Sequence, residues 1–233
     1  MANVTKGKIY GVGVGPGDPE LLTLKAVRII EEADVIAFPM DNSGKSVAYD
    51  IAQKAVNIND KEVLGMNFPM TRDKEELERS WESITDWVEK TLNEGKNIAF
   101  LSLGDVSLYS TWGYLRDRIR ERGFEVESVA GITAMSAVAA KLERNLTDRD
   151  EPLVVIPASV SDSELEELLK LKGGKVIMKA GKHLNEVIAK LEQDGRADRS
   201  GMVINCGMSS EQIYTSLEDI KDAEGYFATI LVK

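Results

Sequence analysis

The chain has 233 residues, of which 43% are hydrophobic and 29% are charged, so it can form one large or two small domains with buried cores. Its formal net charge of −10, with no basic run to offset it, argues against nucleic acid and anionic membranes as partners. A single cysteine, Cys206, and a single histidine, His183, exclude an internal disulfide and a zinc cluster.

Apolar runs of strand length alternate with amphipathic runs of helical length along the whole chain. In the first half, strands are expected at 8–14, 34–39 and 97–103, and helices at 20–32, 46–56, 76–95 and 108–123. In the second half, strands are expected at 125–129, 153–157, 175–179, 201–206 and 226–233, and helices near 132–142, 161–172 and 182–194. This alternation predicts an α/β fold whose sheet is at least partly parallel.

The helix expected at 20–32 has recognisable start signals. Asp18 suits the N-cap and Pro19 suits the first helical position. Its apolar face is expected to contain four residues at helical spacing, namely Leu21, Leu24, Val27 and Ile30.

The segment 11–24, GVGVGPGDPELLTL, has the appearance of a phosphate-binding loop, but known patterns fail on spacing. The dinucleotide fingerprint needs a third glycine where this chain has Pro16 or Asp18. A Walker A loop ending in Gly44-Lys45-Ser46 would need a glycine at Pro39. A Rossmann-type methyltransferase would end its second strand in an acidic residue, whereas the second strand expected here, 34–39, ends in Pro39.

The glycines of this loop still indicate a functional site. Gly13, Gly15 and Gly17 allow close approach of another group, and Pro16 stiffens the turn between them. Ligands of open α/β sheets bind at the carboxyl ends of strands, which is where this loop is expected. Two further loops have the same context, 103–110 (LGDVSLYS) and 128–136 (SVAGITAMS).

Together these three loops resemble the tetrapyrrole methylase family, whose members transfer a methyl group from S-adenosylmethionine (SAM) to corrin and porphyrin precursors. The opening GVGVGPGDPELLTLKAVRIIEEADVIAFP, LSLGDVSLYS and SVAGITAMSA carry the resemblance, which covers nearly the whole chain. Val106 and Ala130 stand where the family usually has proline, which is expected to loosen both loops. Within the family, the segments are most similar to members that methylate C-20 of precorrin-2 or cobalt-factor II in cobalamin biosynthesis.

The resemblance implies two α/β domains with a cofactor trough between them, here placed at 1–116 on the substrate side and 117–233 on the cofactor side. SAM, leaving as S-adenosylhomocysteine, is implied to contact the following residues: Pro16, Leu103, Gly104, Asp105, Leu108, Thr133, Ala134, Met178, Lys179, Cys206, Gly207 and Met208. Substrate contacts are implied for Gly13, Gly15, Gly17, Asp18 and Lys45.

Two interpretations of Asp105 stay open. It is either the acceptor of the proton that leaves C-20 or a residue that only orders its loop. If it accepts the proton, replacement by asparagine is expected to lower turnover more than cofactor affinity.

A polycarboxylate substrate needs local cations on an acidic protein. The candidates beside strand-end loops are Lys45, Arg72, Lys179 and Lys182. Trp81, Trp87 and Trp112 are expected in the core or an interface, and Cys206 is expected to be a packed thiol at a strand end.

No apolar stretch approaches the roughly 20 residues of a membrane span, and the start lacks the apolar core of a secretory signal. We therefore expect a cytoplasmic protein without nucleic acid, membrane or resident metal as partners. The family resemblance implies a homodimer that binds a tetrapyrrole. The alternatives are a methyltransferase for another ring position or for a diphthine-type protein substrate, and a non-catalytic cofactor-binding module.

Overall fold

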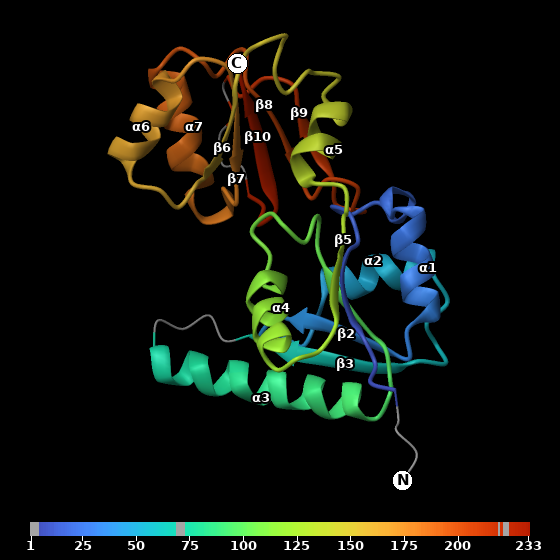
Figure 1. Cartoon of the computed structure of the whole chain (residues 1–233). Helices are drawn as coiled ribbons and strands as arrows, with labels where there is room; N and C mark the ends of the chain where they lie inside the picture. The colour runs from blue at the N-terminus through green and yellow to red at the C-terminus, as the bar shows by residue number, and fades with distance from the viewer. Residues whose placement is uncertain (1–4, 69–72, 219, 221–223) are drawn as a thin grey trace. The chain divides into compact units, whose positions relative to one another are not determined.

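The computed structural model describes residues 5–68, 73–218, 220 and 224–233. The chain divides into two compact units, Met1–Thr133 and Ala134–Lys233, each built around its own five-stranded sheet (Figure 1). The predicted α/β class is therefore confirmed, with one sheet in each unit.

The N-terminal unit contains a fully parallel sheet in the order β3-β2-β4-β1-β5. Its strands are β1 (Ile9–Gly13), β2 (Val35–Met40), β3 (Glu62–Asn67), β4 (Ile98–Ser102) and β5 (Val126–Val129). Its helices are the 3₁₀ turn η1 (Pro19–Leu21), α1 (Leu24–Glu32), α2 (Val47–Ala55), α3 (Lys74–Asn93) and α4 (Trp112–Glu121). Because all strands run in one direction, the loops after β1, β2, β4 and β5 leave the sheet at one edge.

Helices cover both faces of this sheet, as expected for a parallel sheet (Figure 1). One cluster packs α1 and α2 on one face, and the other packs α3 and α4 on the opposite face. Every residue of β4 is buried, which explains why its sequence, IAFLS, is apolar up to the final Ser102. Trp81 and Trp112 are buried in the second cluster and Trp87 is half-buried against it, so the core prediction for these tryptophans is confirmed.

The C-terminal unit has a mixed sheet in the order β6-β7-β10-β8-β9, in which β6 and β7 are parallel and the other pairs are antiparallel. The strands are β6 (Leu153–Pro157), β7 (Gly174–Met178), β8 (Gly201–Ile204), β9 (Gln212–Tyr214) and β10 (Ala228–Val232). The helices are α5 (Ala134–Lys141), α6 (Asp162–Lys170), the 3₁₀ turn η2 (Gly181–His183) and α7 (Leu184–Gln193).

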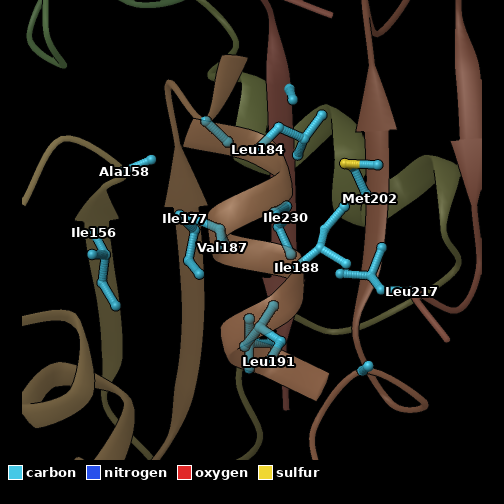
Figure 2. Packing of buried hydrophobic residues seen from close by; sticks show 14 of the residues in the cluster. Ile156, Ala158, Ile177, Leu184, Val187, Ile188, Leu191, Met202, Leu217 and Ile230 are labelled. Carbon is cyan, nitrogen blue, oxygen red and sulfur yellow. The ribbon is translucent and has the colours of Figure 1, made fainter. Parts of the chain in front are cut away.

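The core of this unit lies between α7 and the sheet. Figure 2 shows Leu184, Val187, Ile188 and Leu191 of α7 pointing toward apolar side chains of the strands. These helical positions recur at spacings of three and four residues, which places them on one face. The periodicity that predicted a helix at 182–194 therefore also identifies its buried face.

The domain boundary falls later than expected. The predicted division between residues 116 and 117 lies inside α4, whereas the units divide after Thr133. The reason is that β5 pairs in parallel with β1, so the chain must return to the first sheet before the second unit begins.

The helix expected at 20–32 is interrupted. Asp18 caps the 3₁₀ turn by accepting a hydrogen bond from the Glu20 N–H (2.9 Å), and Thr23 caps α1 through the Ala26 N–H (3.1 Å). The prediction that Leu24 lies on the apolar face of this helix is wrong, because Leu24 is 90% exposed. The buried residues of α1 are Ala26, Ile29 and Ile30, since the helix begins only at Leu24 and its apolar stripe starts one turn later.

An ion cluster fixes the last strand of the first sheet to its neighbours. Glu127 of β5 accepts hydrogen bonds from the Nζ atoms of Lys25 (2.6 Å) and Lys8 (2.7 Å). The bond from Lys25, followed by that from Lys8, lowers the pKa of Glu127 to about 2, from an ordinary value of 4.5. The depressed pKa means that the cluster stabilises the fold above pH 4.5 and that this contribution is lost as pH falls toward 2.

We expect Glu127→Gln to lower the free energy of unfolding by about 1 kcal/mol at pH 7, because the cluster is only partly buried. The difference from the wild-type chain should shrink between pH 4.5 and 2, as Glu127 of the wild type takes up a proton. Denaturant unfolding at several pH values measures it. Glu125→Gln is the control, since Glu125 is 82% exposed at the side chain and lies 4.0 Å from Lys8. A difference that stays constant down to pH 2 would contradict the assignment.

Candidate functional site

Three loops meet at the carboxyl edge of the first sheet, backbone against backbone. The loop after β1 pairs with the loop after β4 through the Gly15 N–H to the Gly104 oxygen (3.2 Å) and the Gly104 N–H to the Gly15 oxygen (2.8 Å). A Cβ on Gly13 would lie 2.7 Å from both the Gly104 oxygen and the Gly131 Cα, in the loop after β5. A Cβ on Gly131 would lie 2.2 Å from the Gly104 oxygen. Glycine is therefore required at this junction by packing alone.

Asp105 joins two of these loops. Its Oδ1 accepts hydrogen bonds from the N–H (2.8 Å) and the hydroxyl of Ser107, and its Oδ2 accepts one from the Gly131 N–H (2.8 Å). Burial alone would raise the pKa of Asp105, but the hydrogen bonds from Ser107, Gly131 and the Val106 backbone together lower it below 3.8. The carboxylate is thus ionised and well supplied with donors from the protein.

Beside this junction, Gly104 leaves room that a ligand can use. Gly104 has φ +72°, a left-handed conformation that favours glycine, and a Cβ there would have only the Ile132 oxygen within 4.0 Å. Unlike Gly13 and Gly131, Gly104 therefore has open space on the side where its Cβ is missing. A cofactor that contacts backbone closely fits such a position.

The predicted cofactor contacts of this unit lie on the same loops. Leu103 and Leu108 are half-buried on either side of the Gly104–Asp105 turn, and Pro16 is buried in the loop after β1. Thr133 follows the Gly131 segment and is half-buried. The three motifs that sequence spacing suggested are thus brought together through main-chain contacts.

Trp112 anchors the helix that follows the Gly104 loop. Its indole N–H donates to the Ser128 hydroxyl (2.8 Å), and its ring occupies the space where a Cβ of Gly11 would lie, 2.2 Å away. Gly11 therefore serves the packing of Trp112 and not a ligand. This contact fixes α4 against β1 and β5, and so fixes where the Gly104 loop ends.

The C-terminal unit gathers its own group of predicted cofactor contacts at one edge of its sheet. Met178 ends β7 and pairs with Thr229, while Ile204 ends β8 and pairs with Ala228 on the same strand, β10. Two strand spacings separate β7 from β8, or about 10 Å. Lys179 (φ +59°) and Gly207 (φ +76°) follow these strand ends in the left-handed conformation. Cys206, which directly precedes Gly207, is 5% exposed, which confirms the packed thiol.

The segment 205–211 after β8 is closed by internal hydrogen bonds. The Met208 N–H donates to the Asn205 oxygen (2.9 Å), and the Gly207 N–H donates to Oε2 of Glu211 (2.6 Å). Oε1 of Glu211 accepts from the Nζ of Lys141 (3.1 Å), which ends α5. Sequence reasoning missed Glu211, because no motif distinguishes it from the many other acidic residues.

The remaining candidate residues form ordinary structural contacts, lie in the C-terminal unit or fall outside the described residues. Lys45 is exposed in the turn after β2, where the Asp41 carboxylate accepts hydrogen bonds from its N–H (3.0 Å) and from Ser43. His183 pairs with Glu186 on the next turn (2.9 Å). Lys182 lies in η2, in the C-terminal unit, and Arg72 lies outside the described residues.

Within the described ranges, no helix combines the length and apolarity needed to cross a membrane. In the same part of the chain, no group of three or more His, Cys, Asp or Glu side chains is arranged to hold a metal ion.

Comparison with known proteins points to one family. Residues 8–221 match the family model described as Tetrapyrrole (Corrin/Porphyrin) Methylases. A protein named probable cobalt-precorrin-2 C(20)-methyltransferase, from Methanocaldococcus jannaschii, is 40% identical over 79% of this chain and 77% of its own length. A precorrin-2 C(20)-methyltransferase from Sinorhizobium sp is 32% identical over 100% of this chain and 97% of its own. A solved structure, titled as a cobalt precorrin-4 methyltransferase of cobalamin biosynthesis, superposes with a TM-score of 0.75 at 23% identity, covering 97% of this chain and 94% of its own.

Proposed function

The chain belongs to the tetrapyrrole methylase family, and from that premise we propose that it transfers a methyl group from SAM to C-20 of a precorrin-2-type tetrapyrrole in cobalamin biosynthesis. The observation that carries this proposal is the match to relatives named for C-20 methylation over 79% and 100% of the chain. Their printed names include substrates with and without cobalt, so both forms of the ring are candidate substrates.

In the N-terminal unit, we propose that the methionine part of SAM contacts the turn 103–108. The open side of Gly104 supports this assignment, because the missing Cβ lets a ligand approach the backbone. Half-buried Leu103 and Leu108 supply apolar contact beside the turn. Pro16 and Thr133, on the adjoining loops, are proposed as neighbours of the same ligand.

Residues of the C-terminal unit are proposed to contact the ribose and adenine of SAM. Ala134 starts α5, and the other contacts follow the ends of β7 and β8. These are Met178, Lys179, Cys206, Gly207 and Met208. Their support is the family resemblance and their shared position at the ends of strands that pair with β10.

When bound, SAM supplies a methyl group already activated on a sulfonium, which an electron-rich meso carbon can attack. The residues of this chain therefore mainly align the two reactants and exclude water. We propose that Asp105 is a positioning residue and not the acceptor of the C-20 proton. A carboxylate with a lowered pKa that already accepts three hydrogen bonds is a weak base.

For the tetrapyrrole itself, Gly15, Gly17, Asp18 and Lys45 stay proposed contacts. Gly13 also belongs to that set, although its contact with Gly104 and Gly131 accounts for the glycine without any ligand. Lys45 follows β2, the neighbour of β4 in the sheet, and so lies at the same edge as the Gly104 loop. Its ammonium group would pair with a carboxylate of the substrate.

We also propose that the protein acts as a homodimer in the cytoplasm. The support is the family resemblance, since burial in the first unit already accounts for Trp81 and Trp112. Light scattering of the purified chain tests the dimer.

The decisive experiment supplies the purified chain with methyl-labelled SAM and either cobalt-factor II or metal-free precorrin-2. We expect one labelled methyl group per ring, located at C-20 by NMR, and S-adenosylhomocysteine as the second product. Label at another carbon would identify a different ring specificity within the family. Binding of SAM without transfer to either ring would favour a non-catalytic module and would contradict the proposal.

A further inference from the structure

The segment 205–211 has an unusual conformation for its position after β8. Asn205 (φ +52°) and Gly207 (φ +76°) are both left-handed within three residues, and asparagine and glycine are the residues that tolerate this best. The Asn205 N–H donates to the Phe227 oxygen (3.1 Å), which holds the start of the segment against the strand connection before β10. The end of the segment is held by a side chain instead.

That side chain is Glu211, whose carboxylate is divided between two partners. Oε2 accepts the Gly207 N–H at 2.6 Å, and Oε1 accepts from Lys141 Nζ at 3.1 Å. The Glu211 side chain is only 18% exposed, so water competes weakly for these bonds. Lys141 ends α5, the helix that begins with Ala134. A single carboxylate thus connects the two segments of this unit that contain most of its proposed SAM contacts.

We propose that Glu211 is a positioning residue for SAM, which acts by holding the Gly207 peptide in its left-handed conformation. This inference rests on the proposed function. While these bonds hold, the Gly207 and Met208 N–H groups donate to Glu211 and Asn205 and are not available to a ligand. The segment then contributes to adenine binding through its shape, and its shape depends on the acceptor at position 211.

The inference is tested by two substitutions that separate the effect of side-chain length from the effect of charge. Glu211→Asp keeps the negative charge near Lys141 but withdraws the oxygens by one methylene, so the bond to the Gly207 N–H is lost. Glu211→Gln removes the charge but keeps an oxygen that can accept from Gly207. We expect the dissociation constant of SAM to rise about 10-fold in Glu211→Asp and less than about 3-fold in Glu211→Gln, with kcat within about twofold of wild type.

The matched controls are the same substitutions at Glu166, which forms an ion pair with Lys190 between α6 and α7 of the same unit. The partner of Glu166, Lys190, belongs to no proposed SAM segment, so Glu166→Asp and Glu166→Gln should leave SAM affinity unchanged. Thermal unfolding of all four variants shows whether any change in affinity merely follows lost stability.

The outcomes separate this inference from the proposed function. A wild-type chain that binds no SAM in calorimetry would contradict the proposed function. A wild-type chain that binds SAM, combined with an unchanged affinity in Glu211→Asp, would overturn the role of Glu211 alone, as would an equal loss in Glu211→Gln.

A further measurement uses the wild-type protein alone and so does not depend on whether a variant folds. The Gly207 amide should be protected from hydrogen exchange in the wild-type protein and more protected with SAM. Exchange at the rate of an open loop would overturn the inference.

Discussion

The Asp105→Asn variant should bind SAM about 10- to 100-fold more weakly than the wild-type chain and should lose about 1–3 kcal/mol of unfolding free energy. The carboxylate accepts hydrogen bonds from two N–H groups and one hydroxyl. An amide has only one oxygen, so its NH₂ group must face either the Ser107 N–H or the Gly131 N–H. Two donors then oppose each other in a nearly closed space, and the loops after β4 and β5 move apart.

Calorimetric titration with SAM and denaturant unfolding measure these two effects. Asp73→Asn is the control, because Asp73 caps α3 through the Glu75 and Glu76 N–H groups and asparagine caps helices about equally well. This control should keep the wild-type affinity for SAM and lose at most a few tenths of a kcal/mol.

The opposite pattern would restore the other interpretation of Asp105. If turnover falls while the dissociation constant of SAM stays at its wild-type value, Asp105 acts on the proton and not on the loop. A pH–rate profile gives independent information. Because the pKa of Asp105 lies below 3.8, its ionisation should contribute no limb to the profile above that pH.

Periodicity in the sequence predicts the buried elements of this fold and the two edge strands that stay mostly covered, β5 and β6, but it misses the other two edge strands. The strand β4 is apolar from Ile98 to Leu101, and α7 repeats apolar residues at helical spacing, so both were predicted close to their observed bounds. The strand β3 was missed because it lies at a sheet edge and exposes three of its six residues. The strand β9 was missed because it has only three residues and lies at the edge of the second sheet, where it pairs with β8 alone. Edge strands have one partner and one solvated side, which weakens the apolar pattern.

For the candidate site, the glycine motifs predict which loops matter but not what each residue does. Glycine spacing pointed to the loops after β1, β4 and β5, and these loops do meet. The role of Asp105 depends on the Gly131 N–H, which is 26 residues away, and no local pattern reveals that contact. Glu211 is similar, since its partners are a backbone N–H and Lys141, 70 residues earlier. Roles that depend on long-range hydrogen bonds to the backbone need the structure.

Gly131→Ala should have a large effect for a single added methyl group. The new Cβ would lie 2.2 Å from the Gly104 oxygen and 2.8 Å from the Gly13 backbone. All of these atoms belong to the main chain, so no flexible side chain can move aside. Relief requires the loops to separate, which breaks the Gly131 N–H bond to Asp105. We expect a loss of about 3 kcal/mol of unfolding free energy, at the upper end for an overpacked site, and SAM binding at least about 100-fold weaker.

The matched control is Gly113→Ala, in which the same methyl group enters α4 with no atom beyond the adjoining helix backbone within 4 Å of the new Cβ. Because alanine favours a helix more than glycine does, this variant should be stabilised by about 0.5–1 kcal/mol and should bind SAM normally. Thermal unfolding and calorimetry of both variants therefore compare one methyl group at a backbone junction with one on an open helix face. If Gly131→Ala matched the wild type in both measurements, the three loops would not be joined through their glycines in solution. The proposed positioning role of Asp105 and the proposed SAM contact at Gly104 would then lose their structural basis.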